Sequence, residues 1–219
     1  YGPDSEDVFY YLTVYNEPYP QPAMPDLPRL REGVLRGIYR YSNAEGDGPR
    51  AQVLASGITV RLAMDAQRLL REDWGVAADV WSVTSWNELR REAVECEEHN
   101  LLHPADERRT PYVTQALMST TGPVVAVSDW MRAVPDAISR WVPGDWQSLG
   151  TDGFGRSDTR ASLRRHFHID PESIAVAVLI ELMHRGEVDA GVPAQAVEKY
   201  RLRDELLPAE KDTTEGAAE

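Results

Sequence analysis

A glycine-rich segment, Gly150-Thr-Asp-Gly-Phe-Gly-Arg-Ser-Asp158, has the residue types best suited to ligand binding. It follows an expected strand and precedes a helix expected to open near Ser157. Free backbone N–H groups and the helix dipole at such a junction can hold an anion or a substrate carboxylate. Its G-x-x-G-x-G order is neither the G-x-G-x-x-G of a dinucleotide site nor the Gly-Lys-Ser/Thr of a P-loop. A tight loop that needs positive φ before a helix cap is the structural alternative, and both interpretations can hold together.

Two neighbouring histidines form a second candidate site. His99 and His103, beside Glu97 and Glu98, have the i, i+4 spacing of zinc ligands on a continuous helix. However, the proline after His103 disfavours helical backbone at that histidine, and the sequence from Asn100 onward indicates a helix that is already unwinding. Helix capping on a solvated surface is therefore the alternative to a metal site.

Two further groups of ring-bearing side chains have ordinary explanations. His166 and His168 flank Phe167 near an expected helix end, where a cationic histidine is favoured by the helix dipole, so we expect no catalytic role for them. A set of aromatic residues near the beginning of the sequence lacks basic neighbours. It is therefore expected to form core or interface and not a base-stacking platform; its members are Phe9, Tyr10, Tyr11, Tyr15 and Tyr19.

Strand and helix patterns alternate along most of the chain, as in a parallel sheet covered on both faces. Strands are expected at 8–15, 51–55, 79–83, 124–127 and 147–150. Helices are expected from 58 to an end at Gly75, and at 86–99, 131–141 and 171–186. Three signals fix helix ends: Gly75 as a C′ residue, Ser85 and Glu88 with capping-box spacing, and Asp170 as an N-cap. Prolines between residues 18 and 28 exclude helix there and favour an extended linker.

The composition excludes several classes of protein. With 219 residues, 42% hydrophobic and 27% charged, the chain can bury a core. Its net charge of −13 repels phosphate backbones and anionic bilayers, so neither nucleic acid nor membrane is an expected partner. Cys96 is the one cysteine, which excludes an intramolecular disulfide and a cysteine-ligated zinc site and favours a cytoplasmic location. The longest nearly apolar run, Ile174 to Ile180, is too short to span a membrane.

Taken together and in order, several segments resemble the C-terminal end of the homodimeric bacterial pyruvate dehydrogenase decarboxylating component, in the transketolase superfamily. The resemblance covers essentially the whole chain except the acidic tail. The segments are Val8-Phe-Tyr-Tyr-Leu-Thr-Val-Tyr-Asn-Glu-Pro-Tyr19, Pro22-Ala-Met-Pro25, Ala55-Ser-Gly57, Asp79-Val-Trp-Ser-Val-Thr-Ser-Trp-Asn-Glu-Leu89, Asn100-Leu-Leu-His-Pro104 and Leu149-Gly-Thr-Asp-Gly-Phe-Gly-Arg-Ser-Asp158.

The resemblance implies a fold and a division into domains. Residues 1–46 would be the end of the pyrimidine-binding middle domain plus a proline-rich linker. Residues 47–203 would form the transketolase C-terminal-like domain, a three-layer α/β fold with a five-stranded, mostly parallel sheet. Residues 204–219 would be a disordered acidic tail.

It also implies an activity for the full-length enzyme. With thiamine diphosphate and magnesium, that enzyme would decarboxylate pyruvate and pass the acetyl group to a lipoyl group on its dihydrolipoyl acyltransferase partner. The family's G-D-G…N metal motif, activating glutamate and catalytic histidines are missing here. We therefore expect no catalytic, cofactor-binding or metal-binding residue in this chain, and an isolated chain that is inactive and does not bind the cofactor.

The resemblance also implies which residues face the active-site channel. These are Asn16 and Glu17 in the exit loop and Asp152, Arg156 and Ser157 in the glycine-rich segment. The exit loop lacks the phosphate-binding arginine of sugar-phosphate transketolases, which favours a small 2-oxo acid. A different hypothesis is a non-catalytic interaction or regulatory module that completes the dimer and docks a partner subunit.

Overall fold

A computed structural model describes Phe9, Val14, Pro18, Tyr19 and residues 27–204. The strand expected at 8–15 falls, apart from two isolated positions, outside the described residues, and so does the acidic tail after residue 204.

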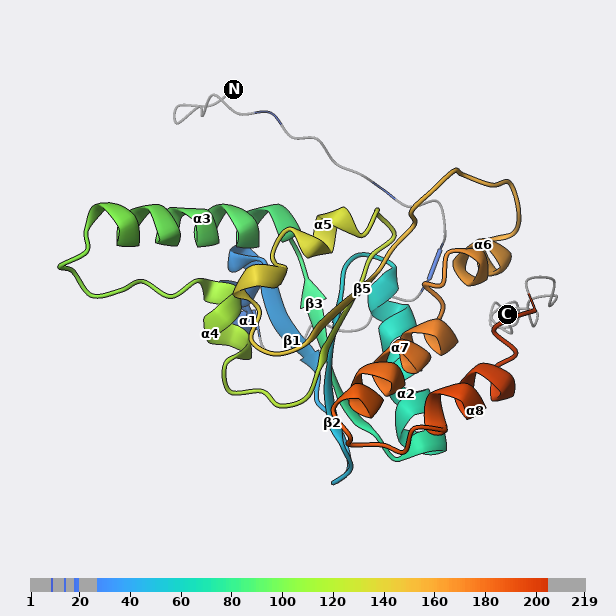
Figure 1. Cartoon of the computed structure of the whole chain (residues 1–219). Coiled ribbons are helices and arrows are strands. Elements are labelled where there is room, and N and C mark those ends of the chain that lie inside the picture. The colour runs from blue at the N-terminus through green and yellow to red at the C-terminus, as the bar shows by residue number, and fades with distance from the viewer. Residues whose placement is uncertain (1–8, 10–13, 15–17, 20–26, 205–219) are drawn as a thin grey trace.

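Five strands form one mixed sheet at the centre of the molecule (Figure 1). They are β1 Ile38–Ser42, β2 Arg50–Ala55, β3 Ala77–Val83, β4 Val124–Val127 and β5 Trp146–Leu149, in the spatial order β1-β3-β2-β4-β5. β1 is antiparallel to β3, whereas every other pairing is parallel. The expected five-stranded, mostly parallel α/β sheet is thus confirmed.

One face of the sheet is covered by α2 Thr59–Trp74, α7 Pro171–His184 and α8 Val192–Lys199 (Figure 1). Leu62, Ala66 and Leu70 lie along one side of α2 at helical spacing and are buried in this layer. α7 is apolar over most of its surface because it lies between the sheet and its helical neighbours. Its hydrophobic run is therefore core and not a membrane segment.

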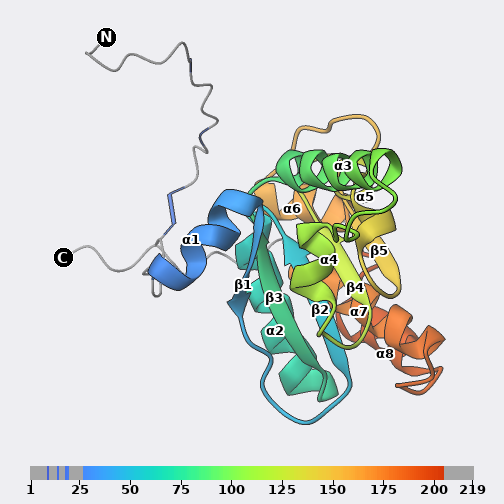
Figure 2. The ribbon, with the colours of Figure 1, turned by 90° about the vertical axis from the view of Figure 1, so that its left-hand side faces the viewer.

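The opposite face carries α3 Trp86–Leu102, α4 Tyr112–Leu117, α5 Ala133–Asp136 and the 3-10 turn η1 Ser139–Trp141. Figure 2 shows this second layer and α1 Leu27–Arg36, which lies next to β1. Successive strand residues alternate between layers, with Val53 in the α2–α7 core and Leu54 in the α3–α4 core. The three-layer prediction is therefore correct.

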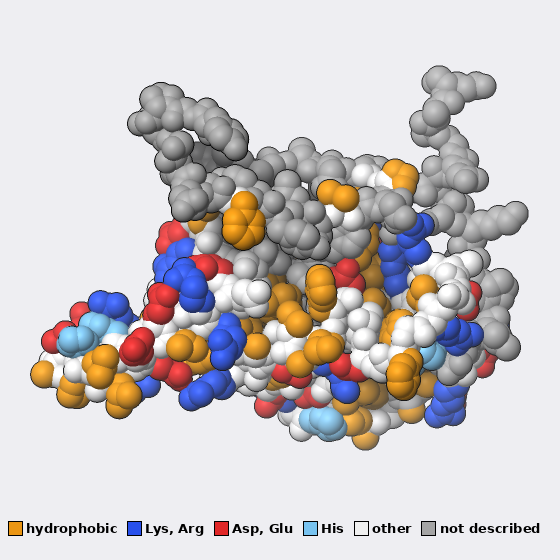
Figure 3. Space-filling view, turned by 90° about the horizontal axis from the view of Figure 1, so that it is seen from above, with side chains coloured by type: hydrophobic (Ala, Val, Ile, Leu, Met, Phe, Trp, Pro, Cys, Tyr) orange, Lys and Arg blue, Asp and Glu red, His pale blue; other side chains and the backbone are white. Residues whose placement is uncertain are grey.

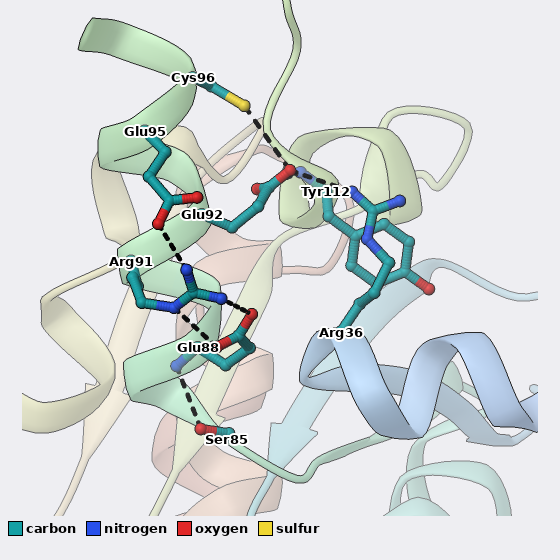
Figure 4. Close-up of polar contacts among 8 residues, drawn as sticks. All are labelled: Arg36, Ser85, Glu88, Arg91, Glu92, Glu95, Cys96 and Tyr112. Carbon is teal, nitrogen blue, oxygen red and sulfur yellow. Dashed lines mark hydrogen bonds and ion pairs between the residues drawn. The ribbon is translucent and has the colours of Figure 1, made fainter.

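A partly buried carboxylate joins α1, α3 and α4 (Figure 4). Glu92 on α3 accepts hydrogen bonds from Arg36 Nη2 on α1 at 3.0 Å and from the Tyr112 backbone N–H on α4 at 2.9 Å. The Cys96 thiol lies 3.6 Å from the same carboxylate, and burial followed by the charge of Glu92 raises the pKa of that thiol. Arg36 also lies over the Tyr112 ring. This contact set fixes α1 against the domain.

The expected helix caps are confirmed. Gly75 ends α2 with φ 63° in the left-handed region. Ser85 Oγ accepts the Glu88 N–H at 3.1 Å, and Asp170 accepts the Ser173 N–H at 2.9 Å. Capping residues within one turn were therefore sufficient to predict these three helix ends from the sequence.

The structure differs from the expected elements within residues 27–46, which were assigned to the end of the preceding domain and its linker. α1 and β1 both lie before residue 46, and β1 pairs with β3, so this part of the expected linker belongs to the sheet. β1 is a short strand at the edge of the sheet, so its residues show only a weak strand pattern in the sequence.

Three helices also depart from the predicted bounds. α3 continues to Leu102, since the Asn100 side chain bonds the Arg109 backbone and keeps the last turn in place. The helix expected at 131–141 is interrupted into α5 and η1 around Pro135. α6 Arg160–His166 has Thr159 as N-cap and begins later than the start expected near Ser157.

None of the helices in the described part of the chain is both long enough and apolar enough to cross a bilayer.

Candidate functional site

The carboxyl ends of β2, β4 and β5 meet along one border of the sheet, which we call the carboxyl edge. The loops that leave it span residues 56–58, 128–132 and 150–159. In open α/β sheets, ligands bind outside the carboxyl ends of the strands. The glycine-rich segment therefore lies on the border where this fold class places its sites.

Small hydroxyl side chains join the first two of these loops. The buried Thr59 Oγ1 lies 2.7 Å from the Ser56 carbonyl and 3.0 Å from the Val127 carbonyl. Ser56 Oγ and Ser128 Oγ are 3.4 Å apart, and Ser128 Oγ accepts the Trp130 N–H at 3.1 Å. The sequence motifs did not single out these hydroxyl side chains as a site. The available signal was a serine directly after each of two strands, Ser56 after β2 and Ser128 after β4.

The glycine-rich loop is fixed to this edge at its start. Gly150 leaves no room for a side chain, because a Cβ there would lie 2.5 Å from the Trp130 carbonyl oxygen. The Thr151 N–H donates to the same carbonyl at 3.0 Å, and Thr151 Oγ1 donates to the Asp129 carbonyl at 3.0 Å. The Asp152 carboxylate accepts from Arg132 Nε and from its backbone N–H. Asp152 thus anchors the loop.

Beyond Asp152 the loop projects from the domain. Gly153 has φ 95°, in the region that favours glycine, as expected. Gly155 lies outside that region with open space around it, so the alternative of a loop that needs positive φ applies to Gly153 and not to Gly155. Phe154 is 97% exposed, which leaves its apolar ring without cover from the described residues.

The remaining candidates of the glycine-rich loop lie near its end. Arg156 Nη2 is 3.5 Å from Asp158 Oδ2, and Arg156 Nη1 is 3.4 Å from His166 Nδ1 on α6. Ser157 is exposed beside them. Asn16 and Glu17, the candidates of the exit loop, lie outside the described residues.

The structure gives no support to a metal site at His99. Its ring packs 4.7 Å from that of His103, the residue that caps α3, and its Nε2 lies 3.9 Å from an Asp106 carboxylate oxygen. Desolvation, and then the charge of Arg109, lowers the pKa of His99. The Glu97 carboxylate instead accepts a hydrogen bond from Trp141 Nε1 at 3.0 Å. Nowhere in the described ranges do three or more His, Cys, Asp or Glu side chains gather as a metal site.

A Gly-Asp-Gly tripeptide does occur at residues 46–48 and was passed over in the sequence analysis. It lies in the connection from β1 to β2, at the border opposite the carboxyl edge. Gly46 has φ 95°, while a Cβ on Gly48 would collide with the Gly75 carbonyl. A tight turn therefore accounts for the two glycines.

Comparisons with known proteins find a family model and solved structures that are similar to this chain. The family model of the transketolase-like TK C-terminal domain matches residues 37–170. The solved structure of a transketolase from Pichia stipitis has a TM-score of 0.48 and 22% identity, covering 70% of this chain and 19% of that chain.

Sequence relatives extend over nearly the whole chain. The pyruvate dehydrogenase E1 component of Mycolicibacterium smegmatis is 57% identical over 93% of this chain and 22% of that protein. The corresponding component of Escherichia coli K12 is 43% identical over 92% of this chain, again 22% of its own length. The chain thus spans about a fifth of the length of these relatives, and the resemblance found from its motifs is confirmed. The chain belongs to the family of transketolase-like TK C-terminal domains.

Proposed function

We propose that this chain is the C-terminal domain of a thiamine diphosphate-dependent pyruvate dehydrogenase component, which decarboxylates pyruvate and transfers the acetyl group to a lipoyl domain. The observation that carries the proposal is the 57% identity over 93% of the chain to a pyruvate dehydrogenase E1 component. Motif order in the glycine-rich loop supports it independently. The reaction belongs to the whole protein, of which this chain matches about a fifth.

The cofactor and its metal are assigned to other domains of that protein. Thiamine diphosphate supplies a nucleophilic carbon and an electron sink, and a divalent cation holds its pyrophosphate. The described residues offer no gathering of carboxylate and imidazole donors suited to that cation, so this part of the chain does not by itself fit the metal that holds the cofactor. In this proposal the chain helps to shape the entrance of the active site and supplies none of the cofactor's ligands.

We assign the glycine-rich loop to the entrance of the active-site channel. Its base is fixed by Gly150, Thr151 and Asp152, whereas its tip presents the exposed ring of Phe154, and Arg156 follows beside Asp158 and His166. A loop fixed at its base and exposed at its tip can contact an incoming lipoyl domain without unfolding the sheet. Asn16, Glu17 and Ser157 complete the proposed channel-facing set.

The assembly is also part of the proposal. The chain would support a homodimer, and its enzyme would act with pyruvate and the dihydrolipoyl acyltransferase of the same complex in the cytoplasm. The domain itself would begin before β1, because β1 is paired within the sheet.

The test uses full-length enzyme carrying Arg156→Ala. If the loop contacts the incoming lipoyl domain, kcat/KM for that domain should fall about tenfold, or about 1.4 kcal/mol, at unchanged Tm. Arg185→Ala is the matched control, since the Arg185 guanidinium forms ion pairs with Asp145 and Glu187 but lies beside the amino end of β5. Unchanged kcat/KM in Arg156→Ala, or equal losses of kcat/KM in both variants, would contradict the assignment of the loop to the channel entrance.

A further inference from the structure

A pocket of about 330 Å³ lies in the α3–α4 layer, away from the glycine-rich loop. Its walls come from the last turns of α3, the segment 108–111 and the residues around η1. We call it the α3–η1 pocket. Figure 1 shows that these elements stand on the side of the domain opposite to α6 and α8. None of the residues assigned above to the channel lines it.

The charge of its lining is opposite to that of the chain. Arg108, Arg109 and Arg140 line the pocket, with Glu97 as the one acidic lining residue. Glu97 is already used, because its carboxylate accepts from Trp141 Nε1 at 3.0 Å and lies 3.0 Å from Arg140 Nη2. The lining therefore has a formal charge of +2 in a chain whose net charge is −13.

Two of these guanidinium groups are available for a ligand. Within the part of the chain that the structure describes, the side chains of Arg108 and Arg109 have neither an ion pair nor a hydrogen bond. The charge of Arg109 acts on neighbouring groups, since it adds to the desolvation that lowers the pKa of His99 and partly opposes the rise in the pKa of Cys96. An arginine that is left unpaired in so acidic a chain has its full donor set free for an anion.

The frame that holds these arginines is well connected. The Asn100 side chain donates to the Arg109 carbonyl and accepts the Arg109 N–H, both at 2.8 Å. Across the pocket, Thr114 Oγ1 donates to the Trp141 carbonyl at 2.6 Å. Both walls are thus tied to helices, and the backbone of Arg109 is held against α3.

We propose that the α3–η1 pocket binds a small phosphate-bearing molecule, with Arg108 and Arg109 as its principal ligands. Guanidinium groups match phosphate oxygens in bidentate geometry, and a phosphate dianion balances the two charges. The volume is at the lower end of the range for small-molecule sites, so it has room for a phosphate and a small organic group. This site is independent of the proposed enzyme activity.

The first test is titration calorimetry of the chain with inorganic phosphate and with glycerol 3-phosphate, at low ionic strength. We expect saturable binding that is tighter for the ester, and at least about a tenfold loss of affinity in Arg108→Gln/Arg109→Gln. Arg61→Gln/Arg203→Gln removes the same charge from exposed positions elsewhere and should change affinity less than about twofold. Absence of saturable binding, or equal losses in the two double variants, would overturn the proposal.

A second readout locates the ligand. In a 1H–15N spectrum, glycerol 3-phosphate should shift the indole N–H of Trp141, which lines the pocket. The indole of Trp74 is bonded to Tyr200 in the other layer and should not move. Single Trp→Phe variants assign the two signals. Movement of Trp74 without Trp141 would place the ligand elsewhere and contradict the assignment.

Discussion

Replacing Gly150 by alanine tests whether the glycine-rich loop is fixed to the carboxyl edge as described. The added Cβ would lie 2.5 Å from the Trp130 carbonyl oxygen and 2.7 Å from the Arg132 backbone nitrogen. Both neighbours are backbone atoms, so no side-chain rotation relieves the contact. Overpacking of this kind costs about 1–3 kcal/mol, and displacement of the Trp130 carbonyl also weakens its hydrogen bond from Thr151, which is worth about 1 kcal/mol. We expect Gly150→Ala to lower the free energy of unfolding by about 3 kcal/mol.

The assay is urea unfolding of three single variants followed by far-UV circular dichroism. Gly153→Ala has open space but φ 95°, so it should cost about 1 kcal/mol. Gly155→Ala has neither constraint and should remain within about 0.5 kcal/mol of the parent. The expected order of stability is therefore Gly155→Ala, then Gly153→Ala, then Gly150→Ala. Equal effects at Gly150 and Gly155 would refute the close contact on which the loop's position depends.

Two other contacts give measurable effects. Glu92→Ala removes the shared acceptor of Arg36 and the α4 backbone, so it should lower the free energy of unfolding in urea by about 2 kcal/mol. The control is Glu95→Ala, which removes an exposed partner of Arg91 and should lower it by less than about 0.5 kcal/mol. Similar losses of stability in the two variants would contradict the role of Glu92. The hydrogen bond from Lys199 lowers the pKa of Asp73 in the folded state. The ionised carboxylate therefore stabilises the fold at pH values above the pKa of Asp73 in the unfolded chain, about 4, and this stabilisation is lost as pH falls through the folded-state pKa. The stability gap to Asp73→Asn should therefore narrow below about pH 4, and a constant gap from pH 3 to 7 would refute this.

Much of the fold was predictable because its signals are local. β4 is a continuous apolar run buried on both faces, and Gly75, Ser85 and Asp170 mark helix ends through contacts within one turn. β1 was missed because its pairing with β3 depends on residues about 40 positions away. Sequence patterns report the period of a segment, but not its remote partner.

The candidate site was predictable in the same limited sense. The glycine-rich loop stands out by composition, yet composition treats Gly150, Gly153 and Gly155 alike. Only the fold shows that the first has no space for a side chain, the second needs positive φ and the third is unconstrained. The anchoring of Asp152 by Arg132 joins two loops that are 20 residues apart, and so no short motif contains it.

The most direct test of the central claim is a structure of the full-length enzyme with thiamine diphosphate bound, determined by cryo-electron microscopy. We expect residues 153–158 to line the entrance of the channel that leads to the cofactor, with Phe154 and Arg156 facing the opening. We also expect the cofactor to contact no residue between 38 and 203. A glycine-rich loop that faces solvent away from every channel mouth would contradict the claim.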